Sequence, residues 1–324
     1  MAAPDRAAAA PPSISVVIVN WNARDDLAAC LRSVRAQREP ADQLVVVDNG
    51  SEDGSSELVA REFSEVALVA TGENLGFAEG CNRGLAVATG DWVAILNNDA
   101  EADPGWIAAL RAAIRAGSPR LGALQSRIVF KQRRDHTNST GLLLLADGRA
   151  RDRDFDALMR PDDAEEPIFC ATAAAALYRR EMLEQVRLPS GYFDRGFFMY
   201  MEDLDLGWRC RLAGWECRYV PASVVYHAFQ ASSSRRGSFF VERHCKTNRV
   251  RALLKNASLP FILASLPRTG LDLAELALRG GPALLPDLLA AARGALAQRA
   301  LVGRMAREDR RAVERRWAVR RRDV

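Results

Sequence analysis

The sequence contains few of the residues that build metal or disulfide frameworks. It has three histidines and six cysteines in 324 residues, and no two cysteines form a CxxC pair. Structural zinc sites are held by cysteine and histidine ligands at short spacings, so the sequence argues against a zinc framework. We interpret the cysteines as reduced thiols, which are typical of a cytoplasmic protein.

Common nucleotide-binding loops and membrane segments are also missing. There is no GxGxxG after the first apolar run and no GxxxxGK[ST], which argues against a dinucleotide oxidoreductase and a P-loop NTPase. No run reaches the roughly 18 uninterrupted apolar residues that a membrane span needs. Residues 1–12 lack the apolar core of a signal peptide, and we expect them to be a disordered lead-in.

The positive charge is concentrated at the C-terminal end. The net charge is +4, and residues 303–324 alone hold nine arginines against four acidic residues. The rest of the chain is therefore close to neutral. A basic tail on a neutral body indicates a local electrostatic contact, not a protein that coats nucleic acid.

Short β-branched runs alternate with amphipathic segments in the first 130 residues. Residues 13–19 (SISVVIV) and 43–47 predict strands buried on both faces, and residues 25–37 between them carry apolar side chains at helical spacing. Strand, helix and strand in this order predict a parallel sheet. Residues 66–70 and 91–96 predict two further strands, so the fold class is α/β.

Polar residues follow these strands where ligands bind in open α/β sheets, beyond the carboxyl ends. Asp48 begins the segment DNGS, which is also good turn chemistry, and one carboxylate can serve both purposes. Asp99 follows the fourth strand and is well placed to hold Mg²⁺ or Mn²⁺ on a diphosphate. The alternative is that Asp99 is only a polar strand terminus.

The segment from 197 to 214 (FFMYMEDLDLGWRCRLAG) has three carboxylates within four residues, after an aromatic run. We predict a helix that begins near these acids, because its N-terminal dipole favours ionised carboxylates. A charged carboxylate aimed into a cleft is what a general base requires. For Asp205 the alternative is an i,i+4 ion pair with Arg209.

Five segments occur in a characteristic order: VVIVNWN, VVVDNGS, ENLGFAEGCNRG, ILNNDA and YMEDLDLGWR. In this respect residues 13–256 resemble the family 2 glycosyltransferases, and specifically their bacterial rhamnosyltransferase-like branch. The resemblance implies a GT-A fold, a Rossmann-like and mostly parallel mixed sheet flanked by helices. It also implies inverting sugar transfer, with a nucleotide-binding half up to about residue 130 and an acceptor half after it.

The resemblance implies a role for each matching residue. Asp203 would be the general base, a choice over Asp205 that rests on the alignment of the motif, and Asp99 with His227 would hold Mg²⁺ or Mn²⁺. The alternative for His227 is a hydrogen-bonded structural residue, the usual role of a lone histidine. The family pattern is usually DxD, and this sequence has Asn97 at its first position. The residues implied for binding of the nucleotide-sugar are Asn20, Asn22, Asp48, Asn74, Gly76, Phe77, Asn82, Asn98 and Asp99.

On the acceptor side, Glu202, Asp205 and Trp208 are expected to contact or position the acceptor. Arg235 and Arg236 lie in a polar segment that is predicted to be a lid over the diphosphate. The resemblance favours dTDP-L-rhamnose as donor, although a pyrimidine site does not separate dTDP- from UDP-sugars. The expected acceptor is a hydroxyl of a cell-surface polysaccharide or a polyprenyl-linked glycan at the cytoplasmic face.

Two other functions are consistent with parts of the sequence. A sugar-phosphate nucleotidyltransferase shares a related sheet, but we expect it to carry a Gly-rich N-terminal phosphate loop that is absent here. A non-catalytic nucleotide-sugar-binding protein is the other, and the presence of Asp48, Asp99 and Asp203 together argues against it.

The remaining segments lead to structural expectations. Residues 131–137 are expected to be a loop, residues 141–146 one arm of a hairpin, and residues 152–166 a solvated charged loop. Residues 257–324 are predicted to form an amphipathic, basic helical region. Its apolar stripe could pack on the body, on a second copy of the chain or on an anionic membrane. The stripe consists of Leu285, Leu288, Leu289, Ala292 and Leu296.

Overall fold

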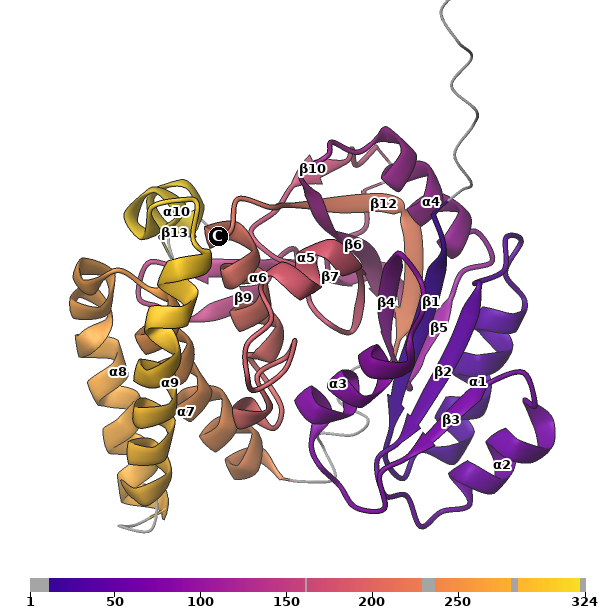
Figure 1. Cartoon of the computed structure of the whole chain (residues 1–324), viewed down its shortest axis with the longest axis horizontal. Helices are drawn as coiled ribbons and strands as arrows, with labels where there is room; N and C mark the ends of the chain where they lie inside the picture. Colours follow the sequence, from indigo (N-terminus) through magenta and orange to yellow (C-terminus); the bar gives the residue numbers. More distant parts are fainter. Residues whose placement is uncertain (1–11, 161, 229–236, 281–284, 321–324) are drawn as a thin grey trace, which may run out of the picture.

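A computed structural model describes residues 12–160, 162–228, 237–280 and 285–320 (Figure 1). Within these ranges a central ten-stranded sheet is flanked by helices, and a group of C-terminal helices lies beside it. In sheet order, the strands are β10 (Glu166–Pro167), β12 (Glu216–His227), β6 (Leu121–Phe130), β11 (Ala175–Arg179), β4 (Trp92–Asn97), β1 (Ile14–Asn20), β2 (Gln43–Asp48) and β3 (Ala67–Ala70), while β5 (Ala100–Ala102) pairs with β12 and β7 (Arg133–Ser139) pairs with β6.

The first four strands run parallel, as predicted. β1 pairs with both β2 and β4, and β2 pairs with β3. Val16 and Ile18 of β1 pack on one face of the sheet, whereas Val17 and Val19 pack on the other. Both faces are covered, which is why the strands read as continuous apolar runs. The helices that follow the strands are α1 (Arg24–Arg35), α2 (Ser55–Glu62), α3 (Phe77–Val87) and α4 (Trp106–Ala116).

The second half of the sheet is mixed. β11 runs antiparallel to β4 and β6, whereas β12 runs parallel to β6. The prediction of a loop at 131–137 was wrong for most of that segment, because β7 pairs antiparallel with β6. The expected hairpin is confirmed: β8 (Leu142–Leu145) pairs antiparallel with β9 (Ala150–Asp152). The chain returns to this hairpin near its C-terminal end, where β13 (Ala318–Val319) pairs with β8.

Helices form most of the remaining structure, and residues 257–320 are largely helical, as predicted. Figure 1 shows α7, α8 and α9 next to one another at one end of the molecule. No helix in the described part of the chain is long and apolar enough to cross a membrane. The helices are α5 (Arg180–Gln185), the 3-10 turn η1 (Arg195–Phe197), α6 (Glu202–Leu212), α7 (Ser238–Asn256), α8 (Leu259–Gly280), α9 (Leu285–Met305) and α10 (Arg310–Trp317).

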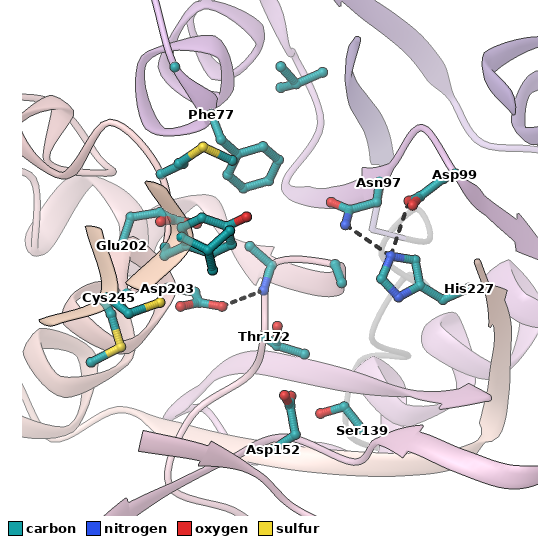
Figure 2. Close-up of a pocket in the computed structure, with 18 of the residues that line it drawn as sticks. Phe77, Asn97, Asp99, Ser139, Asp152, Thr172, Glu202, Asp203, His227 and Cys245 are labelled. Carbon is teal, nitrogen blue, oxygen red and sulfur yellow. Dashed lines mark hydrogen bonds and ion pairs between the residues drawn. The ribbon is translucent and has the colours of Figure 1, made fainter. Parts of the chain in front are cut away.

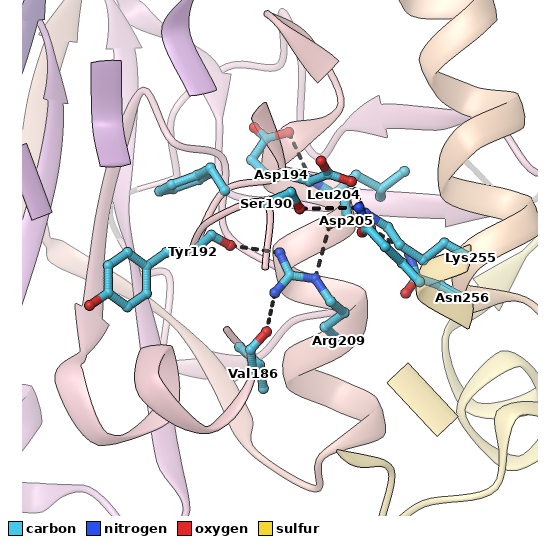
Figure 3. A network of polar contacts seen from close by, with 12 residues as sticks. Val186, Ser190, Tyr192, Asp194, Leu204, Asp205, Arg209, Lys255 and Asn256 are labelled. Atoms are coloured by element: carbon cyan, nitrogen blue, oxygen red, sulfur yellow. Dashed lines mark hydrogen bonds and ion pairs between the residues drawn. The ribbon is translucent and has the colours of Figure 1, made fainter. Parts of the chain in front are cut away.

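A buried polar network joins α7 to α6 (Figure 3). Lys255 of α7 has no exposed surface, and its Nζ lies 2.6 Å from Asp194 and 2.9 Å from Asp205. Asp205 also accepts hydrogen bonds from Arg209 at 3.0 Å and from Asn256 at 2.8 Å. One cation therefore connects α7, the start of η1 and the first turn of α6.

Replacing Lys255 with Met should lower the free energy of unfolding by roughly 3–5 kcal/mol, because two carboxylates lose their cation in the interior. Urea unfolding measures this change. Arg83→Met is the control, because Arg83 is 56% exposed and pairs with Glu79 at the surface, where ion pairs contribute roughly 0.2–1 kcal/mol. Equal losses in the two variants would contradict the central role of Lys255.

Candidate active site

A cavity of about 470 Å³ opens at the carboxyl ends of the parallel strands, and its size is typical of small-molecule sites, roughly 300–1,000 Å³. Both halves of the sheet contribute to it, together with the turn before α6. The structure thereby brings together residues that are more than 100 positions apart in the chain. The predicted site residues that line it are Asn74, Gly76, Phe77, Asn98, Asp99, Glu202, Asp203 and His227.

Asp99 and His227 form a pair on one side of the cavity (Figure 2). Asp99 Oδ1 lies 3.1 Å from His227 Nε2, and both side chains are almost fully buried. They come together because β5, directly after Asp99, pairs with the last residues of β12. Burial raises the pKa of Asp99, but the hydrogen bond and charge of His227 outweigh it, so the pKa lies below its usual value.

The opposite nitrogen of the His227 ring faces Asn138. Its Nδ1 lies 2.9 Å from Asn138 Oδ1, so the ring hydrogen is assigned to Nδ1. Nε2 faces the Asp99 carboxylate and, at 3.2 Å, the side-chain amide of Asn97; a second ring proton on Nε2 gives the charge that lowers the pKa of Asp99, and a cation would take the place of that proton. Histidines that bind metals commonly donate their second N–H in this way. Asp99 and His227 together thus supply two donors suited to a divalent cation.

No group of three or more His, Cys, Asp and Glu side chains in the described ranges could hold a metal on its own. The two donors suffice only if the substrate supplies further oxygens. Mg²⁺ is commonly bound in this way, by one or two carboxylates with phosphate oxygens and water.

Asp203 lies on the other side of the cavity from His227 (Figure 2). Its carboxylate is fixed by two backbone donors, Leu204 N–H at 2.8 Å and Ala173 N–H at 3.2 Å. Burial raises the pKa of Asp203 above its usual value, although these hydrogen bonds lower it. A fixed carboxylate with a raised pKa is a stronger base than an exposed one.

The turn that presents Asp203 is strained. Three non-glycine residues in it have positive φ angles: Phe198 at 62°, Tyr200 at 67° and Met201 at 69°. Such conformations persist only where the surroundings hold them, and they cluster at functional sites. One side chain of α7 holds this turn: Asn248 Nδ2 lies 2.8–2.9 Å from the carbonyl oxygens of Phe197, Met199 and Tyr200.

The same turn explains Gly76. A Cβ atom on this residue would lie 2.5 Å from the carbonyl oxygen of Phe198, and its φ of +84° suits glycine. The loop before α3 and the turn before α6 therefore meet at a point where only a backbone without a side chain fits.

Two further carboxylates line the cavity. Burial and the charge of Asp203 raise the pKa of Glu202 well above its usual value, and Glu202 Oε2 has no hydrogen-bond partner among the described residues. Asp152 was placed in a solvated loop by the sequence, and that expectation was wrong. Residue 152 ends β9 opposite Leu142 and lines the cavity. Burial raises its pKa to about 6, against a lowering hydrogen bond with Ser139.

Several residues predicted to bind the donor lie next to the cavity without lining it. Asn20 Oδ1 accepts a hydrogen bond from Asn98 at 2.8 Å, and Asn22 Oδ1 accepts one from the N–H of Glu52 at 2.8 Å. Asp48 accepts hydrogen bonds from the Ser51 N–H and the Ser56 hydroxyl, which is the turn role that DNGS predicts.

Other predicted residues hold the scaffold. Asn82 connects α3 to the segment before η1, because its side chain donates to the carbonyl of Phe193 at 2.8 Å and accepts from the N–H at 3.0 Å. Trp208 is fully buried and makes edge contacts with Phe169 and Phe261. Asp205 makes the predicted ion pair with Arg209 in the interior. The predicted lid residues Arg235 and Arg236 lie outside the described residues.

Comparison with known proteins identifies the family of this chain. The profile of the family described as "Glycosyl transferase family 2" matches residues 15–187. The N-acetylglucosaminyl-diphospho-decaprenol L-rhamnosyltransferase of Mycobacterium tuberculosis is 29% identical over 261 residues, which are 72% of this chain and 82% of that protein. A poly-beta-1,6-N-acetyl-D-glucosamine synthase of Staphylococcus aureus is 22% identical over 66% of this chain and 49% of its own length.

Solved structures share the fold. A mannosyltransferase from Pyrobaculum calidifontis in complex with GDP-Man and Mn²⁺ has a TM-score of 0.55 and 21% identity over 94% of this chain and 87% of its own. GalNAc-T7 with UDP, GalNAc and Mn²⁺ has a TM-score of 0.61 and 16% identity over 76% of this chain and 48% of its own. The fold is that of a GT-A glycosyltransferase. The chain belongs to glycosyltransferase family 2.

Asp152→Asn should stabilise the fold above about pH 6. The pKa of Asp152 is higher in the folded protein, at about 6, than its usual value of about 4. The wild-type protein therefore becomes less stable as the pH rises from about 4 to about 6, because losing the proton costs more free energy in the folded state. The stabilisation should therefore shrink as the pH falls through this window and vanish below it. Urea unfolding at about pH 7.5 and about pH 4 measures it.

Asp156→Asn is the matched control for this prediction, because Asp156 lies on the same segment and its side chain is 50% exposed. It should change stability little at either pH. An Asp152→Asn effect of the same size at both pH values would contradict the raised pKa.

Proposed function

We propose that this protein is an inverting, divalent-cation-dependent glycosyltransferase that uses a pyrimidine nucleotide-sugar. The main support for this proposal is the position of Asp203 opposite the Asp99–His227 pair across one cavity (Figure 2). Sugar transfer requires these two functions on opposite sides of the reacting carbon: a base for the acceptor hydroxyl and a site for the leaving diphosphate.

Asp203 would accept the proton of the acceptor hydroxyl while the hydroxyl oxygen attacks the anomeric carbon. The bond from that carbon to the diphosphate breaks in the same displacement, so the anomeric configuration inverts. The hydrogen bonds from Leu204 and Ala173 hold the base in place during this step. Mg²⁺ or Mn²⁺ on Asp99 and His227 would neutralise charge on the diphosphate.

L-rhamnose from dTDP-rhamnose is the donor that we favour, and a polyprenyl-linked glycan is the acceptor. The mycobacterial relative, which is a rhamnosyltransferase for a decaprenol-linked sugar by its name, supports both choices. A UDP-sugar donor and a cell-surface polysaccharide acceptor are the alternatives. Donor hydrolysis with a panel of dTDP- and UDP-sugars distinguishes the donors.

Asp203→Asn should lower kcat by roughly 10²–10⁴-fold, because the amide cannot accept the hydroxyl proton. Donor binding should be unchanged. Glu202→Gln is the matched comparison, since Glu202 is the neighbouring buried acid in the same cavity. Steady-state kinetics measure kcat for both variants, and NMR of the product reports whether the anomeric configuration is inverted. A larger loss in Glu202→Gln than in Asp203→Asn would show that the base is assigned to the wrong carboxylate.

Asp99→Asn and His227→Gln should remove the contribution of Mn²⁺ to nucleotide binding. In a thermal-shift assay, dTDP at 100 times its Kd stabilises the protein by roughly 2.7 kcal/mol. We expect this shift to require Mn²⁺ or Mg²⁺ in the wild type and to fall in both variants. Asp135→Asn is the control, because Asp135 has a 71% exposed side chain outside the cavity. A metal-independent shift in the wild type would contradict the proposed cation site.

A further inference from the structure

The outward side of α8 is apolar, which is the reverse of an ordinary surface helix. We define the α8 outer face by five exposed leucines. Their exposed fractions range from 51% to 88%, and the shorter residues between them on this side include Ala264, Gly270 and Ala277. Single exposed leucines are common, but a continuous apolar face indicates a binding surface. The five leucines are Leu259, Leu263, Leu266, Leu271 and Leu278.

Polar contacts fix the inward side of α8. Asp272 is 2% exposed and binds Arg249 of α7 and Arg268 of α8, each at 2.5 Å. Ser265 is fully buried and donates to the carbonyl oxygen of Phe261 at 2.8 Å. The Arg249–Asp272 and Lys246–Glu275 ion pairs join α8 to α7, so rotating α8 to bury its leucines would break them. The apolar face is therefore held outward.

Helix α9, which like α8 packs on α7, also carries exposed apolar and basic residues. Leu289 and Leu296 are 48% and 55% exposed. Arg293 and Arg304 are exposed and follow these leucines at helical spacings of four and eight residues, so all four share one side of α9. Leucines beside arginines on one surface are typical of helices that lie at an anionic lipid interface.

The charge of the C-terminal region favours lipid over a second copy of the chain. Helices α8 and α9 hold five arginines and no lysine against three acidic residues, and residues 306–324, which follow them, add eight arginines against four acidic residues. Two copies that met through this surface would bring like charges together, whereas an anionic membrane complements them. The middle of α8 contains Arg268 and Asp272, so the helix would lie along the bilayer surface.

We propose that the α8 outer face, with Leu289, Arg293, Leu296 and Arg304 of α9, docks this protein on an anionic lipid bilayer. The apolar stripe within residues 284–301 predicted α9 to be the apolar helix, but the structure gives the larger exposed apolar face to α8. The proposal does not depend on the donor or the transfer reaction. It places the enzyme on the surface that would hold a polyprenyl-linked acceptor.

Vesicle flotation of the full chain tests the docking surface. The wild type should float with vesicles that contain phosphatidylglycerol and bind phosphatidylcholine vesicles at least about fivefold more weakly. The double variant Leu263→Glu with Leu271→Glu should lose at least about tenfold in affinity, because two apolar side chains no longer enter the bilayer. Leu158→Glu is the matched control: Leu158 is 67% exposed but lies outside the C-terminal helices, and its variant should bind like the wild type.

A second pair of changes tests the electrostatic part. Arg293→Gln and Arg304→Gln should each reduce binding to anionic vesicles by about fivefold and leave binding to neutral vesicles unchanged. Light scattering in solution tests whether a second copy of the chain covers this face instead. Failure of the wild type to bind anionic vesicles at low salt would overturn the proposal. So would a dimer that the leucine variants convert to a monomer, because the face would then be covered by a second copy.

The proposed function is tested separately, since vesicle binding needs neither a sugar donor nor a cation. Loss of transfer activity in Asp203→Asn with normal vesicle binding would support both proposals. Normal transfer to a water-soluble acceptor by the double leucine variant would show that its active site is intact.

Discussion

The buried charge of Lys255 is the constraint on which the second half of this chain depends. A lysine without exposed surface is stable only beside carboxylates, and here it has Asp194 and Asp205. The contact with Asp205 holds the first turn of α6, which also contains Glu202 and Asp203. The helix that carries the candidate base is thus held by a cation from α7, far along the chain. The C-terminal helices are in this sense part of the active-site scaffold.

The cavity combines a rigid part with a strained part. The ends of the parallel strands are fixed by the sheet and by covering helices on both faces, and they present Asp99 with little freedom. The turn before α6 has no such support from regular structure, and Asn248 holds it through three carbonyl oxygens. Strain stored in such a turn is maintained by tertiary contacts. The sheet therefore holds Asp99 on one side of the cavity, and the side chain of Asn248 holds the turn before Asp203 on the other.

Much of the fold could be predicted because its signals are local. Continuous β-branched runs such as 13–19 predicted parallel strands correctly, and the acids after residue 201 marked the start of α6. The strand at 133–139 was missed because its sequence, RRDHTNS, is polar and becomes a strand only by pairing with β6. Asp152 was missed for a related reason. Its charged surroundings indicated a solvated loop, and only the pairing of β8 with β9 directs it to the cavity.

The sequence by itself determined the alternation of strands and helices, the family and the chemistry available at the strand ends, because these depend on residue type and short spacings. Tertiary structure decided which of the three neighbouring acids reach the cavity. Glu202 and Asp203 line it, whereas Asp205, two residues after Asp203, points to Lys255 and Arg209 in the interior. Side chains of residues i and i+2 on a helix point in directions about 200° apart. The packing of α6 therefore directs Asp203 to the cavity and Asp205 to a structural ion pair. The same reasoning applies to α8, whose sequence is amphipathic but whose outward side is chosen by the burial of Asp272.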